Sequence, residues 1–483
     1  MQHRPLRVKL ILPSLTEAGS PDWRPIKYSL FPPVGLATLA ACFGEGDDLE
    51  LVDEHVQDLH SDDTPDLVLI QVYITNAYRA YALADHYRAK GCYTVLGGLH
   101  PTALPDEAAQ HADTLITGPG EYVFDTFLDD FRQGRPKRRY HAERRDLDKR
   151  NLPRRDLICR DKYLVPNSLV VSRGCPHHCD FCYKDAFYQG GKSFYTLRTD
   201  QALAEIESLP GRHLYFLDDH LLGNPRFARS LFEGMRGMNR LFQGAATVES
   251  ILKDDLIERA AEAGLRSLFV GFETLNPANL SASNKTHNLG KDYAAAIRKL
   301  HGLGVMINGS FVFGLDDDDE DVFDRTVAWA VDNGITTATF HIATPYPGTR
   351  FYRAVEMQNR LTTRNWDLYD TRHSVYRPSR MSAAALEQGY RRAYDSFYSW
   401  RNIVKSSRHP ALAPNRLKQF LYTAGWKKCE SFWNIAIQSG VLERSRPLLE
   451  SLLSTRREEK VPPALVRTAL PGVKPGFSPE NGA

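Results

Sequence analysis

The sequence predicts an α/β protein made of an N-terminal doubly wound parallel sheet, a partial (β/α)6 barrel and a C-terminal helical domain. Two stretches support the α/β class, because short apolar runs alternate with helical patterns over residues 6–131 and again over 166–345. Such alternation indicates parallel sheets covered by helices. From about residue 382 only the helical pattern remains, so we expect a separate helical domain there.

The N-terminal domain, residues 1–131, is expected to hold five strands with helices between them. The strands are expected at 8–12, 49–52, 67–72, 94–97 and 114–117, and the helices near 34–43, 76–90, 103–111 and 121–132. Ligands of doubly wound sheets bind beyond the carboxyl ends of the strands. The loops at that edge should therefore carry the binding residues.

A basic linker, residues 132–165, is expected after this domain. Residues 132–155 contain eleven Lys or Arg and three acidic residues. The favoured interpretation is a solvated connection between domains, because runs of like charge rarely pack. The alternative is a strip that binds an anionic group of a substrate or cofactor.

The partial barrel is expected over residues 166–380. Its strands are expected at 168–173, 212–218, 244–248, 266–272, 305–313 and 335–343, and its helices near 199–208, 225–238, 254–263, 290–303, 319–332 and 349–359. Six such units suggest an open barrel, in which functional residues gather at the carboxyl ends of the strands.

The C-terminal helical domain, residues 381–455, carries aromatic residues at helical spacing. The stripe comprises Leu386, Tyr390, Ala393, Tyr394, Phe397 and Tyr398, and later Leu417, Phe420, Leu421 and Trp426. We expect core packing for this stripe, and the alternative is a helical cap over an apolar substrate pocket. The tail, residues 456–483, has little periodicity and is expected to be disordered.

Composition narrows the function classes. The 61 basic residues nearly balance the 59 acidic ones, so no nucleic-acid partner is expected. No run approaches the 18 or more apolar residues of a membrane span, and the short apolar run near residue 8 lacks a signal-peptide cleavage site. Seven cysteines without paired spacings do not resemble a secreted disulfide framework. A cytoplasmic location is therefore expected.

Three cysteines carry the strongest chemical signal. Cys175, Cys179 and Cys182 follow the first expected barrel strand with the spacing C-x3-C-x2-C. A loop of this kind can turn three thiolates toward one point and leave a fourth metal position open. Zinc in a Cys3His site is conceivable with His177 or His178, but an all-thiolate pocket favours an iron–sulfur cluster.

The cysteine spacing, with the aromatic Phe181 before the last cysteine, resembles the radical S-adenosylmethionine (SAM) superfamily. The resemblance implies that the three cysteines hold a 4Fe–4S cluster and that SAM chelates the fourth iron. It further implies reductive cleavage of SAM to a 5′-deoxyadenosyl radical, which removes hydrogen from an unactivated carbon. An electron donor such as flavodoxin or ferredoxin is then expected as a partner.

The same resemblance assigns further residues to SAM, together with Phe181. Asp218 and Asp219, which close the second barrel strand, are expected to accept hydrogen bonds from the SAM ammonium group, although Asp is also a common helix N-cap. Glu273 is expected to face the ribose. Lys285 is assigned to the SAM carboxylate, with a surface lysine as the alternative.

Four elements of the N-terminal domain resemble the cobalamin-binding domain that precedes many radical SAM cores. They are Phe31-Pro-Pro-Val-Gly-Leu36, Asp53-Glu-His55, Gly97-Gly-Leu-His-Pro101 and Gly118-Pro-Gly-Glu121. The cobalamin contacts implied by the resemblance are Pro33, Gly35, His55, Tyr73, Thr75, Gly97, Gly98, His100, Gly120 and Glu121.

His55 is the candidate lower axial ligand, because a nearby carboxylate orients an imidazole well for a metal. The family glycine three residues after this histidine is Asp58 here. The alternatives are a surface-loop histidine at position 55 and a lower face lined by Tyr73 and Thr75.

These features favour a cobalamin-dependent radical SAM enzyme that C-methylates a small organic, natural-product-like or lipid-like molecule. The alternatives are a radical SAM cyclase or ring-rearranging enzyme, a relative whose N-terminal domain no longer binds cobalamin, and a non-catalytic cobalamin or iron–sulfur sensor. The C-terminal aromatic residues mildly favour a substrate with hydrophobic surface.

Overall fold

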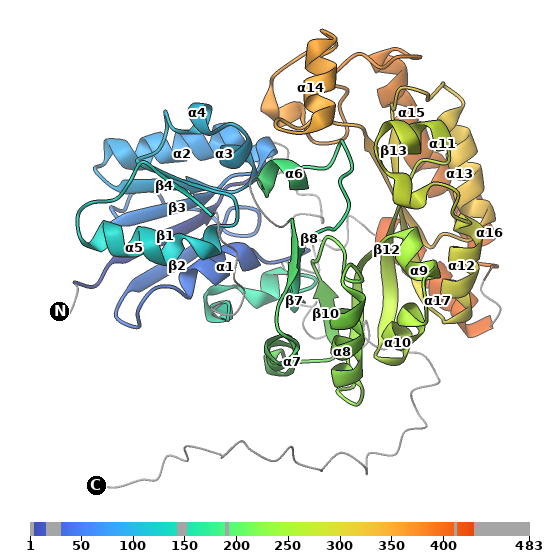
Figure 1. The fold of residues 1–483 in the computed structure, drawn as a ribbon, viewed down its shortest axis with the longest axis horizontal. Coiled ribbons are helices and arrows are strands. Elements are labelled where there is room, and N and C mark those ends of the chain that lie inside the picture. Colours follow the sequence, from blue (N-terminus) through green and yellow to red (C-terminus); the bar gives the residue numbers. More distant parts are fainter. Residues whose placement is uncertain (1–3, 16–29, 143–151, 189–192, 410–412, 429–483) are drawn as a thin grey trace, which may run out of the picture.

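The computed structural model describes residues 4–15, 30–142, 152–188, 193–409 and 413–428, so the tail predicted to be disordered lies outside the described residues. Two six-stranded sheets, both parallel, lie side by side, and the C-terminal helices pack on the outer side of the second sheet (Figure 1). The predicted α/β class is confirmed.

The N-terminal sheet contains all five predicted strands and one more. Its strands are β1 (Arg7–Leu12), β2 (Asp48–Asp53), β3 (Leu67–Gln71), β4 (Tyr93–Gly97), β5 (Thr114–Thr117) and β6 (Arg139–His141). Its helices are α1 (Val34–Ala40), α2 (Ala77–Ala89), α3 (Leu99–Ala103), α4 (Pro105–Ala108) and α5 (Phe124–Arg132). The order β2-β1-β3-β4-β5-β6 reverses direction between β1 and β3, which is the switch point where such sheets bind ligands.

Part of the basic segment packs between the two sheets. Strand β6 pairs with β5, and Arg155 forms an ion pair of 2.8 Å with Glu205, whose side chain is 2% exposed. Tyr163 is buried and donates a hydrogen bond of 2.8 Å to Asp53. This part of the segment is therefore an ordered junction rather than a solvated one, while residues 143–151 lie outside the described residues.

The second sheet has the order β14-β13-β12-β11-β10-β7 and is open at both edges. Its strands are β7 (Ser168–Leu169), β10 (His213–Phe216), β11 (Leu241–Ala246), β12 (Leu265–Glu273), β13 (Met306–Phe313) and β14 (Thr337–Ile342). The helices that connect them are α7 (Thr199–Ser208), α8 (Pro225–Met235), α9 (Val248–Leu252), α10 (Leu256–Glu262), α11 (Pro277–Ala282), α12 (Tyr293–Gly302), α13 (Val322–Asp332) and α14 (Arg350–Met357).

The first barrel strand differs from the prediction. Instead of one strand over 168–173, β7 pairs with β10, whereas β8 (Ser172–Gly174) pairs antiparallel with β9 (Phe194–Thr196). The cause is Asp218, whose carboxylate accepts hydrogen bonds from the backbone N–H groups of Val171 and Ser172 at 3.3 and 2.5 Å. These amides leave the parallel ladder, so the chain turns immediately before the cysteine loop.

The C-terminal helices are α15 (Ala383–Phe397), α16 (Trp400–Ser406) and α17 (Ala413–Lys428). The hydroxyls of Tyr394 and Tyr398 exchange hydrogen bonds with the backbone of Phe340 and Ala338 on strand β14. They occupy the polar groups of an edge strand, which would otherwise be open to pairing with another chain. The core interpretation of the aromatic stripe on α15 is confirmed.

The core interpretation is wrong for α17. Leu417 and Leu421 are 60% and 44% exposed, because the helix turns its polar Gln419 and Thr423 inward. These two side chains donate hydrogen bonds to the carbonyls of Gly334 and Thr336 at 3.1 and 2.7 Å. The Trp426 side chain lies outside the described residues.

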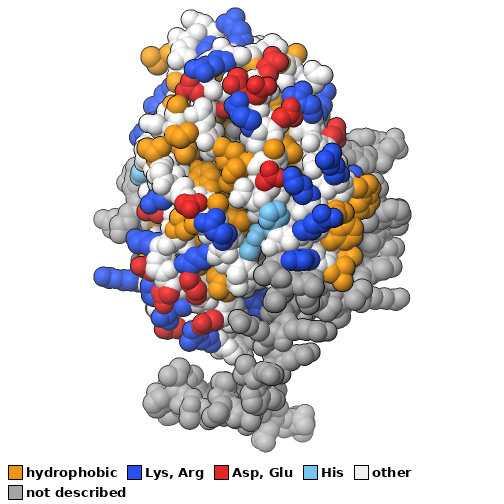
Figure 2. All heavy atoms as spheres, turned by 90° about the vertical axis from the view of Figure 1, so that its right-hand side faces the viewer, with side chains coloured by type: hydrophobic (Ala, Val, Ile, Leu, Met, Phe, Trp, Pro, Cys, Tyr) orange, Lys and Arg blue, Asp and Glu red, His pale blue; other side chains and the backbone are white. Residues whose placement is uncertain are grey.

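The outer surface of the second sheet carries mixed charge. On the face shown in Figure 2, basic and acidic side chains are interspersed around smaller apolar areas. Arg259 of α10, for example, contacts both Asp255 and Glu233. Among the described residues, no helix has the length and apolar character needed to cross a bilayer.

A substitution at Gly98 tests how closely the backbone packs at the carboxyl edge of the first sheet. Its φ is +119°, and a Cβ at this position would lie 2.7 Å from the carbonyl oxygen of Val72. We therefore expect Gly98→Ala to destabilise β3 and β4 by about 1–3 kcal/mol, measured by native-state hydrogen exchange of their amides. The control is Gly302→Ala, where a Cβ meets nothing within 4 Å. Equal protection in both variants would refute this account of the edge.

Candidate active site

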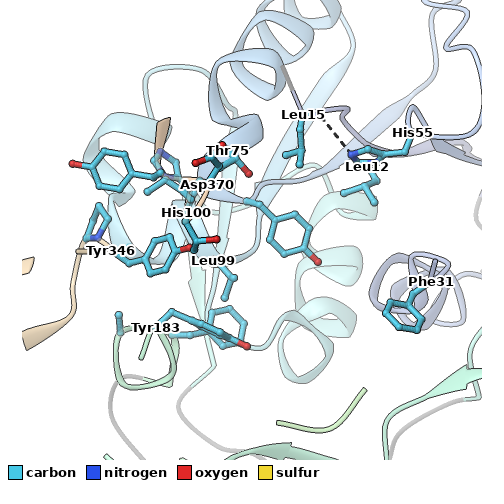
Figure 3. Close-up of a pocket in the computed structure, with 18 of the residues that line it drawn as sticks. Leu12, Leu15, Phe31, His55, Thr75, Leu99, His100, Tyr183, Tyr346 and Asp370 are labelled. Carbon is cyan, nitrogen blue, oxygen red and sulfur yellow. Dashed lines mark hydrogen bonds between the residues drawn. The ribbon is translucent and has the colours of Figure 1, made fainter. Parts of the chain in front are cut away.

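A chamber of about 460 Å³ lies where the carboxyl edges of the two sheets face each other. Its wall combines loops of the N-terminal sheet, residues of the segment 183–187 that contains α6 (Lys184–Phe187), the turn 344–349 and a later segment, 361–376, which we call the strap. The lining residues are Leu12, Leu15, Phe31, Asp53, His55, Tyr73, Ile74, Thr75, Leu99, His100, Ala103, Tyr183, Ala186, Phe187, Tyr346, Pro347, Tyr369, Asp370 and Thr371 (Figure 3).

The N-terminal side of the chamber coincides with the switch point of the sheet. Leu12 ends β1, Tyr73 and Thr75 follow β3, and His100 follows β4. Of the residues that the sequence assigned to cobalamin, four border the chamber: His55, Tyr73, Thr75 and His100. The others lie outside its wall: Pro33, Gly35, Gly97, Gly98, Gly120 and Glu121.

His55 is buried, so the surface-loop alternative is wrong. Its Nδ1 lies 2.7 Å from Asp53 Oδ1, and the other Asp53 oxygen accepts the Tyr163 hydroxyl. With Nδ1 oriented by the carboxylate, Nε2 accepts a hydrogen bond of 3.4 Å from the Leu15 amide at one end of the chamber (Figure 3). His55 thus has the carboxylate-oriented arrangement of a metal ligand, and the Leu15 amide would have to yield Nε2 to the metal.

The strap crosses from the second sheet to the first and is held there by Glu107. One Glu107 oxygen accepts hydrogen bonds from Tyr81 at 2.9 Å, Trp366 Nε1 at 3.1 Å and the His100 ring at 3.0 Å. Burial alone would raise the pKa of Glu107, but these donors outweigh it and hold the pKa below its ordinary value. The contact therefore ties the strap to a histidine of the chamber wall.

Backbone strain marks the point where the strap reaches the chamber. Thr371 has a φ of +65°, which is an outlier for a β-branched residue. Its carbonyl accepts a hydrogen bond of 2.7 Å from the Ile342 amide, and its hydroxyl lies 3.2 Å from the His341 ring. Strain of this kind persists where surrounding contacts enforce it, often at binding sites. At this end of the chamber, Asp370, Tyr346, Thr75 and His100 gather (Figure 3).

The cysteine loop lies between β8 and α6. Gly174 enters it with a φ of +74°, and a Cβ there would lie 1.9 Å from the Ser193 carbonyl oxygen. Burial raises the pKa of the Cys179 thiol to about 11 and that of Cys182 to about 12, and it also raises the pKa of Cys175. The three thiols are close enough to influence one another electrostatically.

The described residues offer no site for a single metal ion at the cysteine loop. Among the described residues, no three His, Cys, Asp or Glu side chains gather closely enough to ligate one metal ion. A cluster with one thiolate on each of three irons does not require such a meeting point. The two histidines of the zinc alternative have other contacts. The ring centroids of His177 and His287 are stacked 3.6 Å apart, and His178 Nδ1 lies 3.0 Å from Asp185 Oδ1.

The residues assigned to SAM surround this loop. Both Asp218 oxygens accept hydrogen bonds from the β7–β8 turn, and burial raises its pKa to about 7. Asp219 accepts the Tyr183 hydroxyl at 3.0 Å. Phe181 is half-buried in the loop.

Glu273 and Lys285 form an ion pair at the end of β12. The ammonium lies 2.6 Å from Glu273 Oε1, and Lys285 is 6% exposed, so its surface alternative is wrong. Glu273 has a φ of +63°. The buried ion pair with Lys285 thus fixes the Glu273 carboxylate at this edge despite the strained backbone of Glu273.

Several chamber residues were not predicted. Tyr183 and Phe187 could have been inferred from their place beside Cys182, since a loop that holds a cofactor also places its neighbours. The strap residues Tyr369, Asp370 and Thr371 carry no periodic or motif signal in the sequence, and only tertiary contacts bring them to the wall.

Comparison with known proteins agrees with this geometry. Residues 169–350 match the Radical SAM superfamily. The chain is 30% identical over 386 residues to bacteriochlorophyllide d C-12(1)-methyltransferase of Chlorobaculum tepidum, covering 77% of this chain and 84% of that protein. It is 26% identical to the C-8(2)-methyltransferase of the same organism, covering 84% and 92%. The chain belongs to the cobalamin-binding-domain radical SAM enzyme family.

Solved structures share the fold of this radical SAM enzyme. The methyltransferase TsrM from Kitasatospora setae, with cobalamin and a [4Fe–4S] cluster bound, has a TM-score of 0.62 at 13% identity and covers 91% of this chain and 100% of its own. The cobalamin-dependent radical enzyme OxsB, with aqua-cobalamin bound, has a TM-score of 0.65 at 15% identity and covers 89% and 72%.

The donor sets of the chain fit the three cofactors of the family. The buried, mutually interacting thiols suit a 4Fe–4S cluster. The strained Glu273 and its Lys285 partner offer a carboxylate and a cation for SAM beside that loop. On the opposite side, the Asp53–His55 pair and the switch-point loops border the space that a cobalamin would need.

The Glu107 contact predicts a pH-dependent stability. Because the folded pKa is below the ordinary 4.5, its contribution is fully present above that value and is lost as pH falls through the folded pKa. At neutral pH we expect Glu107→Gln to lower the free energy of unfolding by about 1 kcal/mol after screening of the partly exposed carboxylate. Thermal unfolding of both proteins should show this difference and its loss in acid.

The matched control is Glu262→Gln, which removes an exposed carboxylate paired with Arg236. It should change stability by less than about 0.5 kcal/mol. A Glu107→Gln effect that persists unchanged in acid would contradict the assigned ionisation.

Proposed function

We propose that this enzyme C-methylates an unactivated carbon of a flat, largely apolar organic molecule of the tetrapyrrole class. The observation that carries the proposal is the chamber, which is bordered on one side by the cobalamin-domain loops and on the other by residues adjoining the cysteine loop. A substrate in this space can be approached from both cofactor sides without leaving the protein.

The chamber wall supports a flat substrate. Aromatic rings from five separate segments line it: Phe31, Tyr73, Tyr183, Phe187, Tyr346 and Tyr369. Ligand pockets that are mostly apolar with a few polar groups orient a molecule through those groups, and Asp370 with Tyr346 would do so at the strap end. The named substrates of two relatives, bacteriochlorophyllides, are flat tetrapyrroles of this kind.

The residues would divide the work as follows. Cys175, Cys179 and Cys182 would hold the cluster, and Asp219 would accept the SAM ammonium group, because the Asp218 oxygens are engaged by the β7–β8 turn. Glu273 would accept the ribose hydroxyls. When bound, the cluster and SAM supply an electron and a carbon-centred radical, and cobalamin supplies a methyl carrier.

The protein's own contribution is position and exclusion of water. The chamber is partly open, so a bound substrate would complete the exclusion of water. The strap would hold the substrate at the end formed by Asp370 and Tyr346, away from His55, which would contact cobalamin. We further propose a low-potential flavodoxin or ferredoxin as electron donor. We also propose a cytoplasmic location, because thiolates that hold a cluster need a reducing compartment.

The proposal predicts that cluster binding can be lost while cobalamin binding is kept. Cys179→Ala should hold less than about a tenth of the wild-type iron and form no 5′-deoxyadenosine, since a three-thiolate site loses one ligand. The same variant should bind hydroxocobalamin with unchanged absorption, because the cobalamin wall belongs to another sheet. Iron analysis, chromatography and absorption spectra measure these quantities. Cys92→Ala, which changes a buried cysteine just before strand β4, is the control.

Substrate turnover is tested with SAM carrying a CD3 group. Anaerobic enzyme with cobalamin, reductant and a bacteriochlorophyllide should release 5′-deoxyadenosine and a product that is heavier by one transferred methyl group. Asp370→Asn should weaken substrate binding about tenfold and leave SAM binding intact. Deoxyadenosine formation without label transfer to any tetrapyrrole would refute the proposed substrate class.

A further inference from the structure

Lys184 is a buried cation inside the cysteine loop. It follows Cys182 by two positions at the start of α6, and its side chain is 1% exposed. Lysine is almost never fully buried unless it is paired. Its ammonium donates hydrogen bonds to the carbonyl oxygens of Cys175, at 2.7 Å, and of His177, and lies 3.3 Å from Asp185 Oδ1.

These contacts join the last part of the loop to its first part. The chain leaves Cys175, passes through Cys179 and Cys182, and is then tied back by Lys184 to the carbonyls where it began. Two backbone N–H groups of the same loop are directed at its sulfurs. The His177 amide lies against the Cys175 sulfur, and the Lys184 amide lies against the Cys182 sulfur.

The second buried lysine of this region is compensated differently. Lys285 forms a 2.6 Å ion pair with Glu273, whose side chain is 12% exposed. Lys184 has neutral carbonyls as its nearest partners, and its carboxylate neighbour Asp185 is 30% exposed and also contacts His178. The positive charge of Lys184 is therefore balanced less closely than that of Lys285.

We infer that Lys184 is a positioning residue that raises the reduction potential of the cluster held by the three cysteines. The inference rests on the proposed cluster site. Reduction adds one electron from the donor to the cluster and breaks no bond. The added negative charge is stabilised by a nearby buried cation and by N–H groups directed at the sulfurs, two of the factors that set cluster potentials. Lys184 provides the cation with its side chain and one of the two N–H groups with its own backbone.

The alternative is that Lys184 only stabilises the loop and has no electrostatic effect on the cluster. Two substitutions distinguish these roles. Lys184→Gln keeps an N–H donor for the carbonyls and removes the charge, whereas Lys184→Arg keeps the charge. Lys184→Met removes both. Lys253→Met is the control, because this exposed lysine lies beside His177 in a small neighbouring cavity. Each full-length protein is reconstituted anaerobically, its iron is counted, and its EPR signal is followed in a redox titration without SAM or substrate.

We expect Lys184→Gln to retain its iron and to show an about tenfold lower ratio of reduced to oxidised cluster at a fixed potential, as for the loss of one partly screened charge. For one electron this corresponds to a midpoint potential about 59 mV more negative. Lys184→Arg and Lys253→Met should stay within about twofold of wild type. Iron-loaded Lys184→Gln with the wild-type potential would overturn the inference, even if Lys184→Met failed to load. Wild-type protein that binds no cluster would instead overturn the proposed function.

Discussion

Parallel strands deliver their following loops at one edge of a sheet only, and here two such edges face one chamber. The switch point of the first sheet and the cysteine loop of the second each lie at a carboxyl edge. The chamber between them therefore depends on the two sheets keeping this relative placement. Three contacts hold that placement: Arg155 with Glu205, Tyr163 with Asp53, and Trp366 with Glu107. Each joins segments far apart in the chain.

The chemistry of the cysteine loop depends on the opposing effects of burial and charge. Burial raises the pKa of all three thiols, yet a cluster binds thiolates. Lys184 and Lys285 oppose burial at Cys175 and Cys179, since a nearby cation favours the charged sulfur. The same cations would favour the extra electron of a reduced cluster. A loop built for thiolate binding is therefore also built to accept negative charge.

Much of the fold was predictable because buried parallel strands and amphipathic helices leave periodic patterns. The five N-terminal strands and the helices of the second sheet fall close to their predicted positions. The division of the first barrel strand was not predictable, because it depends on the Asp218 carboxylate, which arrives from a strand 46 residues later. The exposed leucines of α17 were missed for a similar reason, since its inward face is polar and hydrogen-bonded.

Site residues that belong to a sequence motif were predictable. Site residues that only tertiary contacts bring to the chamber were not. The cysteines and the Asp53–His55 pair are adjacent in sequence, whereas the strap reaches the chamber only through Trp366 and the strained Thr371. The central claim is that cobalamin and the iron–sulfur cluster border one chamber. It is tested most directly by EPR of protein that holds cob(II)alamin and the reduced cluster together. Splitting or broadening from magnetic coupling between the two centres is predicted, and a simple sum of two uncoupled spectra would contradict the account.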